Sequence, residues 1–417
     1  MRTLFAVLAL VVLALAWARM GFREERASLG FRLGWSSSAY FLFVGYLLGP
    51  RGVNLLTPTV LEALTPVVVL GLGWIGLAYG AQFNREVLTG FTIRELAGVA
   101  GQALVAFALL AAAGLLTYEA VAEPDALGRA LVLAGAAAAC VSTPTGLGVV
   151  FGAVDASGPV SRLLSLATSL DGAVGIALLS TVLAMNHPPS LPVPPGGAGL
   201  LWLAIEVALG VFYGWLFRVL TKGELESTEF LLFLLGLALV AAGTSTLFSL
   251  SALLACSITG AMVANRSVLR RRAREVLARW EKPVYLVFLL LAGALLQFPG
   301  WIVLPLVAGY VLVRAGSKFA GGMVLGRVLS ADDRRSDLGL GLSAQGGISI
   351  AMAVSVYHVV GHAHPDAAAV DLFFTTVVVG VLVSELSGPA LIRGVLERAG
   401  EIQPDRGRAA REIRRRS

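Results

Sequence analysis

Residues 159–185 read PVSRLLSLATSLDGAVGIALLSTVLAM, an apolar segment that is long enough to cross a lipid bilayer. Its acidic residue, Asp171, lies near the middle, whereas its other charged residue, Arg162, lies close to the beginning. An ionisable side chain at the centre of a bilayer costs roughly 2.5–3.5 kcal/mol on insertion scales. Such a residue is usually retained for transport, for proton relay or for a buried ion pair. The segment therefore indicates a membrane protein in which Asp171 has a functional role.

The composition of the whole chain also indicates a membrane protein. Its 417 residues are 57% hydrophobic and 14% charged, and the mean hydropathy is +0.81, which excludes an ordinary soluble domain. Because one span needs about 20 mostly apolar residues, we expect an all-α polytopic protein with about thirteen transmembrane helices. They are expected at about 4–20, 34–50, 60–83, 93–118, 127–152, 159–185, 199–220, 228–247, 249–265, 283–298, 301–326, 336–360 and 368–395.

The distribution of Lys and Arg among the connecting loops predicts the orientation. With the C-terminus in the cytoplasm, the cytoplasmic segments hold 27 of the 32 basic residues, and the other side holds Arg2, Arg51 and Arg129. The N-terminus is then external, and we expect a multi-pass protein of the cell (inner) membrane. Basic runs at 270–274 and 411–416 then fix the topology and contact anionic membrane lipid, so no nucleic acid partner is expected.

Three parts are expected along the chain. Residues 1–33 form an extra N-terminal span and a cytoplasmic loop, residues 34–395 form the membrane domain, and residues 396–417 form a basic cytoplasmic tail. The first span ends in Ala16-Trp17-Ala18, a sequence that also suits a cleavable signal peptide. Cleavage would place the arginines of the following loop outside, against the charge distribution. A retained span is therefore the preferred interpretation.

The membrane domain divides into two five-span units of opposite orientation, residues 34–185 and 249–395, as in transporters with inverted repeats. The fourth span of each unit is interrupted, by Ser142-Thr143-Pro144-Thr145-Gly146 and by Ser343-Ala344-Gln345-Gly346-Gly347. Proline removes a backbone donor, and paired glycines weaken a helix. Non-helical backbone at membrane depth is tolerated only where it is buried in protein or lines a cavity. We therefore expect two broken helices that cross each other.

A cation site is expected where the two breaks meet. The ends of the half-helices place partial charges there, and Asp171 would supply the negative charge. The freed carbonyls and the hydroxyls of Ser142, Thr143 and Thr145 would hold a partly dehydrated monovalent cation. Thr168, three residues before Asp171 on the same helical face, is an accessory ligand. The alternative interpretation is a kinked packing helix whose hydroxyls bond to their own backbone.

Charged residues in other spans complete the expected site. Arg314, in the middle of its span, is a counter-charge for the aspartate and for the opposed helix ends. Lys318 lies one turn further on the same face and is a second candidate, although its long side chain is expected to extend to the cytoplasmic surface. Glu206 and Glu385 are accessory candidates, each of which would either bind a proton or form structural hydrogen bonds.

Several motifs resemble those of bacterial sodium/proton and Kef-type potassium/proton antiporters, members of the monovalent cation:proton antiporter superfamily. Gly45-Tyr46-Leu47-Leu48-Gly49-Pro50 is similar to the signature of their first core span. Ser142-Thr143-Pro144-Thr145, followed by Asp171, resembles their first broken helix and transport aspartate. Arg314 is similar to their basic residue opposite that aspartate, and residues 339–347, GLGLSAQGG, resemble their second broken helix.

The resemblance covers roughly residues 34–395. It implies a homodimer with a dimer-forming panel and a six-helix core that moves like an elevator. Two positions depart from the family pattern. Leu170 stands where many relatives have Asn, Gln or a second Asp, which argues against the two-aspartate electrogenic subtype. Gln345 stands where many relatives have Arg.

The expected function is secondary active antiport of Na+ or K+ against H+, in which the two ions occupy Asp171 alternately. A single carboxylate indicates electroneutral exchange. One alternative is a potassium efflux or channel-like subunit that needs a separate regulatory partner, and another is an organic-anion symporter on a related fold. The chain has no motif of an intramembrane enzyme. No cofactor is expected, and the expected metal is the transported ion at Asp171.

Overall fold

The structure is a computed structural model that describes residues 38–83, 85, 89–151, 156–187, 197–221, 227–265, 270–328, 335–364 and 368–402. Helices dominate these residues, as expected for an all-α protein. In chain order they are α3 (Ser38–Leu48), α4 (Pro58–Ala63), α5 (Thr65–Gly80), α7 (Ile93–Val121), α8 (Ala126–Ala139), α9 (Pro144–Phe151), α10 (Pro159–Met185), α11 (Gly197–Leu220), α12 (Ser227–Leu247), α13 (Ala252–Ala264), α14 (Arg270–Ala294), α15 (Val303–Gly326), the 3-10 helix η2 (Leu338–Leu342), α16 (Gly347–Ala363) and α17 (Ala368–Arg398).

The helices agree with the predicted spans over the described residues. Six of them are long and apolar enough to cross a membrane, namely α7, α10, α11, α12, α15 and α17. Shorter apolar helices occupy the remaining predicted positions, apart from the position of α14. The predicted span at 4–20 and most of the predicted tail lie outside the described residues.

The predicted boundary of α14 is wrong. A span was expected over 283–298 after a cytoplasmic loop, but the helix begins at Arg270 and ends at Ala294. Its first half is amphipathic, because Ala273 and Leu277 are buried while Arg279 is exposed. The apolar residues therefore recur with the helical period. The basic run that was assigned to a loop instead forms the first turns of a helix that extends beyond the apolar segment.

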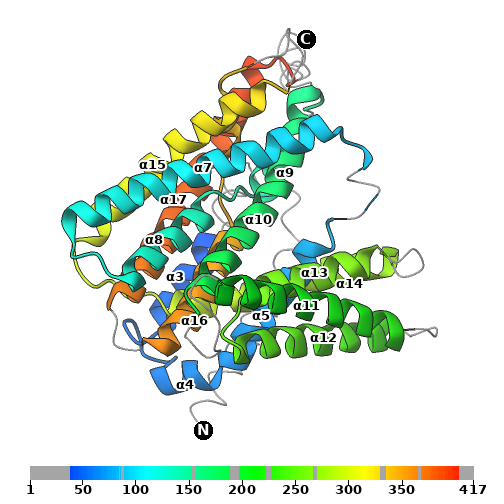
Figure 1. Cartoon of the computed structure of the whole chain (residues 1–417), viewed down its shortest axis with the longest axis vertical. Coiled ribbons are helices and arrows are strands. Elements are labelled where there is room, and N and C mark those ends of the chain that lie inside the picture. Colours follow the sequence, from blue (N-terminus) through cyan, green and yellow to red (C-terminus); the bar gives the residue numbers. More distant parts are fainter. Residues whose placement is uncertain are drawn as a thin grey trace, which may run out of the picture.

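Helices of the two repeats pack in corresponding pairs. α3 packs against α14, and α5 packs against α13. α7 and α15, the third helices of the two units, pack against each other and run side by side in Figure 1. α3 and α5 lie in the first two spans of the first unit, and α13 and α14 lie in the first two spans of the second. The pairings α3–α14 and α13–α5 are therefore equivalent, as an inverted repeat requires.

Both predicted interruptions are present. In the first repeat, α8 ends at Ala139, residues 141–143 are non-helical, and α9 begins at Pro144. In the second repeat, η2 is followed by non-helical residues 343–346 before α16 begins at Gly347. Each fourth span is thus two helical segments joined by a short non-helical stretch of backbone.

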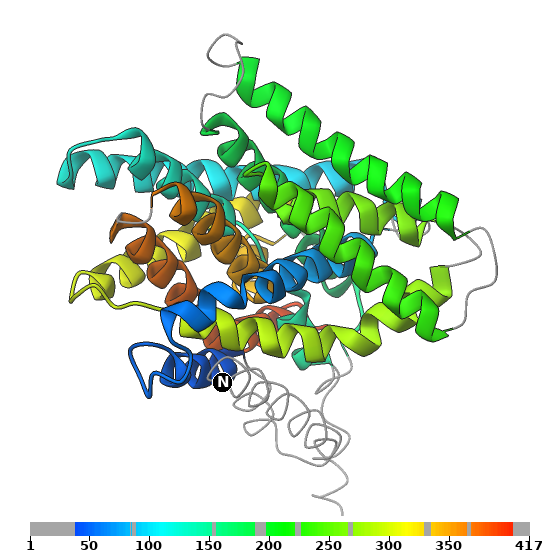
Figure 2. The same cartoon turned by 90° about the horizontal axis from the view of Figure 1, so that it is seen from below.

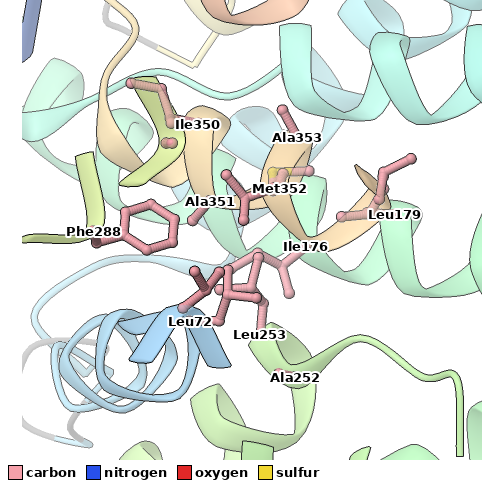
Figure 3. Packing of buried hydrophobic residues seen from close by; sticks show 14 of the residues in the cluster. Leu72, Ile176, Leu179, Ala252, Leu253, Phe288, Ile350, Ala351, Met352 and Ala353 are labelled. Atoms are coloured by element: carbon pink, nitrogen blue, oxygen red, sulfur yellow. The ribbon is translucent and has the colours of Figure 1, made fainter. Parts of the chain in front are cut away.

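The helices form two groups, which we call the core and the panel. The core contains α7–α10, α15, η2, α16 and α17, and the panel contains α3, α5 and α11–α14 (Figure 1, Figure 2). Figure 3 shows the apolar boundary between them, where Ile176 of α10 and Met352 of α16 gather with Leu72 of α5 and Leu253 of α13. This boundary consists largely of aliphatic side chains.

Polar contacts join helix ends at one side of the bundle. Arg94, at the start of α7, donates to the carbonyl oxygen of Arg327 at 2.8 Å. The Glu401 carboxylate, beyond α17, accepts hydrogen bonds from the backbone N–H groups of Val160 and Ser161, each at 2.7 Å, and so caps the N-terminus of α10. All of these residues belong to segments that the charge distribution assigns to one side of the membrane.

Candidate ion-binding site

Asp171 lies in the middle of α10 and is fully buried. Three buried side chains from three other segments surround its carboxylate. The Lys318 ammonium of α15 lies 2.6 Å from Oδ2, and the Ser142 hydroxyl lies 2.7 Å from the same oxygen. The side-chain amide of Gln102, from α7, donates to Oδ1. The carboxylate is thus held where α7, α10, α15 and the first interruption meet.

The position of Lys318 corrects the expectation that it extends to the cytoplasmic surface. Its side chain is 0% exposed, and its ammonium forms an ion pair with Asp171. α15 is covered at this level by α7 and η2, so the lysine has no free surface along which to extend. A buried charge is costly unless it is paired, and Asp171 provides the partner.

Arg314, one turn earlier on α15, bonds to backbone carbonyls. Its Nε donates to Ala139 at 2.9 Å, its Nη1 to Ser343 at 2.6 Å and its Nη2 to Val141 at 3.0 Å. These carbonyls lie at the ends of both interrupted helices, where the helix dipole leaves partial negative charge. The guanidinium contacts the ends of both interrupted helices, and the lysine, rather than the arginine, pairs directly with the aspartate.

The two interruptions cross and are bonded to each other. The Thr143 backbone N–H donates to the carbonyl oxygen of Ala344 at 3.0 Å. The Ser142 hydroxyl lies 2.8 Å from the carbonyl oxygen of Leu342 as well as 2.7 Å from Asp171. A hydroxyl carries one proton, so Ser142 donates to one of these acceptors at a time. When it donates to the carbonyl, its oxygen lone pairs are turned towards the site.

The other residues that were predicted at the two interruptions lie where α9 and α16 begin. Pro144 begins α9, Gly346 is the N-cap residue of α16, and Gly347 begins that helix. Thr145 lies in the first turn of α9, but its side chain is outside the described part of the structure. Thr168 is buried on α10, and its hydroxyl donates to a carbonyl of its own helix, one turn earlier, at 3.1 Å.

Gln345 is buried in the second interruption and links it to α8 and α15. Its side-chain amide donates to the carbonyl oxygen of Ala138 at 3.0 Å and to the Tyr310 hydroxyl at 3.0 Å. The side chain therefore holds the second break against the end of α8. A neutral amide fits here because Arg314 already supplies the positive charge.

The structure separates Glu206 from the group around Asp171. Glu206 is fully buried on α11, and Ser180 donates to its Oε1 at 3.0 Å. Ser180 follows Asp171 by nine residues on α10, which is about 13 Å along a helix axis. Glu385 lies in α17 and is partly buried.

Sequence reasoning did not single out Gln102, although a signal was present. Gln102 is an amide in the apolar interior of α7, and burying an amide away from water is costly unless it is hydrogen-bonded. The amide oxygen Oε1 has no hydrogen-bond partner among the described residues. The described residues also contain no cluster of three or more His, Cys, Asp or Glu side chains that would hold a resident metal.

The fold and the site together define an all-helical membrane protein of the secondary-transporter class, in which two broken helices cross beside buried charges. The chain belongs to the sodium/hydrogen exchanger transmembrane family, whose model matches residues 27–394. This family comprises transporters rather than enzymes.

Solved structures of one archaeal protein share the fold. The structure of the sodium proton antiporter MjNhaP1 from Methanocaldococcus jannaschii at pH 8 has a TM-score of 0.67 and 16% sequence identity, covering 95% of this chain and 100% of that chain. An electron-microscopy map of the same antiporter gives a TM-score of 0.65 and 15% identity, covering 96% of this chain and 100% of that chain. No curated protein matches the sequence.

Proposed function

We propose that this protein exchanges Na+ or K+ for H+ across the membrane and that the cation competes with the protonated Lys318 amine for the Asp171 carboxylate. The observation that carries the proposal is the complete burial of this carboxylate among donors from α7, α15 and the first interruption. Family membership and the shared fold support cation/proton exchange as the function.

An incoming cation has to displace the Lys318 ammonium. The ammonium lies 2.6 Å from Asp171 Oδ2, in the place that a bound cation would take. A cation bound to the same carboxylate would lie close to the ammonium and be repelled by it. Cation binding therefore requires Lys318 to lose its proton, which leaves to the side from which the cation enters. When the cation leaves, a proton returns to the amine, and the ion pair forms again.

Two neighbouring oxygen atoms complete the proposed cation site. The Ser142 hydroxyl donates to Leu342 once the ammonium is displaced, which leaves its lone pairs for the cation. The Gln102 amide oxygen, buried without a partner among the described residues, is a second neutral ligand. Oxygen ligands of this kind suit hard cations.

The charge balance favours electroneutral exchange. The pair of ionised Asp171 and protonated Lys318 carries no net charge. The state with a bound monovalent cation and a neutral Lys318 carries none either. Moving a net charge through the membrane interior is costly. Because both states are neutral, the site would be able to switch between the two sides of the membrane in either of them. One cation would then exchange for one proton.

Transport in proteoliposomes tests this proposal. Asp171→Asn is expected to abolish cation-driven collapse of a pH gradient, whereas Asp125→Asn, which changes an exposed helix cap, is expected to leave exchange unchanged. Exchange retained by Asp171→Asn would remove this residue from the mechanism. A conductance above carrier rates in planar bilayers would instead favour the channel-like alternative.

We also propose a homodimer whose C-terminus lies in the cytoplasm. The charge distribution supports the orientation, because 27 of 32 basic residues fall on the assigned cytoplasmic side. Labelling of a cysteine introduced after residue 403 from one side of intact cells tests the orientation. The mass of the protein in nanodiscs tests the dimer.

A further inference from the structure

Glu206 is a buried acid that the proposed ion site does not use. The Ser180 hydroxyl lies 3.0 Å from Oε1, and Oε2 is buried with no hydrogen-bond partner among the described residues. The salt bridges of the described residues do not include Glu206. Because an ionised carboxylate without a cation is very costly in such surroundings, this packing accommodates the neutral acid.

The helices packed against α11 bring no positive charge to Glu206. α12 and α13 contain no Lys or Arg, and the arginine of α10 lies in the first turn of that helix. α13 faces the acid with the buried thiol of Cys256. The Thr244 hydroxyl of α12 is already bonded to Tyr213 of α11 at 2.6 Å. On α10, the group that faces the acid is Ser180.

The contact between Ser180 and Glu206 crosses the boundary between core and panel. Ser180 lies on α10, the core helix that carries Asp171, and Glu206 lies on α11 of the panel. One turn before Ser180, Ile176 packs in the apolar boundary shown in Figure 3. A separation of the two helices by about 1 Å along the line of this bond would lengthen it beyond hydrogen-bonding range.

We propose that Glu206 is a second proton-binding site, outside the ion site, and that its proton holds α10 against α11. In the arrangement described here, the acid is neutral and docked on Ser180. When the core separates from the panel, water reaches the carboxyl group, which then releases its proton. A rise in pH therefore favours separation of the two helices. This inference does not depend on cation binding at Asp171.

Infrared difference spectroscopy tests the protonation of Glu206 in protein that carries Asp171→Asn. The ion site is disabled in that background, so the result is independent of the antiport proposal. A carboxylic-acid C=O band is expected at neutral pH, and adding Glu206→Gln is expected to remove it. An unchanged carboxylic-acid C=O region with and without Glu206→Gln would overturn the proposal, because it would show that Glu206 is ionised.

Two further variants test the contact itself. Ser180→Ala is expected to shift the same C=O band to higher frequency, because the carbonyl loses its hydrogen bond. Thr181→Ala is the matched control, since the Thr181 hydroxyl bonds to its own helix at 2.8 Å. An unchanged band in Ser180→Ala would overturn the docking contact, and this readout does not require Glu206→Gln to fold.

Hydrogen–deuterium exchange tests the link to helix separation. In the wild type, exchange in the second half of α10 is expected to rise between about pH 6 and pH 9 beyond the intrinsic increase in rate. In Glu206→Gln, which stays neutral, this additional rise is expected to disappear. The same pH dependence in both proteins would overturn the proposed link between the Glu206 proton and the position of the core.

Discussion

Arg314 and Lys318 lie one turn apart on α15, yet they bind different kinds of partner. The arginine bonds to carbonyls of both interrupted helices, and the lysine forms an ion pair with Asp171. Geometry explains this division. A planar guanidinium with five fixed donors serves several separate acceptors, whereas an ammonium is a compact charge that suits one carboxylate. The residue that bonds to both interruptions is therefore distinct from the one that a cation displaces in the proposed mechanism.

Replacing Lys318 by Met should destabilise the protein. The change leaves the buried carboxylate of Asp171 without its cation, a loss that typically costs about 3–5 kcal/mol. Adding Asp171→Asn should recover much of this loss, because the second change removes the unpaired charge. Thermal unfolding of both single variants and the double variant in detergent measures the coupling. Strictly additive effects would show that the ion pair is not formed in solution.

Replacing Arg314 by Lys should also destabilise the crossing, although the charge is kept. A lysine cannot reach the separated carbonyls of Ala139, Val141 and Ser343 at once, and each buried acceptor left unsatisfied costs about 1–3 kcal/mol. Arg129→Lys is the control, because its partner Glu119 is half exposed. Equal melting temperatures for the two variants would contradict the assigned role of the guanidinium.

Gly346→Ala should force the two interruptions apart. A Cβ at this position would lie 2.8 Å from the Thr143 side-chain oxygen and 3.0 Å from its Cβ. Overpacking of this kind costs about 1–3 kcal/mol, and displacement of Thr143 should also reduce exchange. Gly316→Ala is the matched control, because a Cβ there meets no atom within 4 Å. Comparable stability and transport in the two variants would disprove the close approach.

The ion pairs of Asp337 should make stability depend on acidic pH. Burial raises the pKa of this carboxyl, but hydrogen bonds and charges from Arg335 and Arg398 outweigh it and hold the pKa below its ordinary value of 3.8. A depressed pKa contributes stability above the unfolded value, and this contribution is lost as the pH falls through the folded value.

The wild type should therefore melt above Asp337→Asn at neutral pH. The difference should begin to shrink as the pH falls towards the ordinary pKa of the carboxyl, and it should vanish only below the lowered pKa of the folded protein. Melting temperatures of both proteins across the acidic range provide the measurement. A difference that persists unchanged in acid would assign the effect to packing rather than to the charge of Asp337.

The sequence carries a strong signal for the span pattern, because twenty-residue apolar segments and loop arginines are local features. It also locates both interruptions and Asp171, since a proline, paired glycines and an acid inside apolar helices are each costly without a structural reason. The start of α14 was not predicted, because its first turns carry the basic run 270–274, and basic runs were assigned to loops. Loop assignment from charge ignores that an amphipathic helix can continue past the membrane.

The sequence by itself determined the class of the protein, the two broken helices and the acid between them, because these follow from the cost of placing polar groups in lipid. Only the tertiary structure decided that Lys318, rather than Arg314, pairs with Asp171 and that Gln102 joins them. It also decided that Glu206 faces Ser180. Those pairings depend on how distant helices cross and which of their faces meet, and no residue spacing along the chain specifies that geometry.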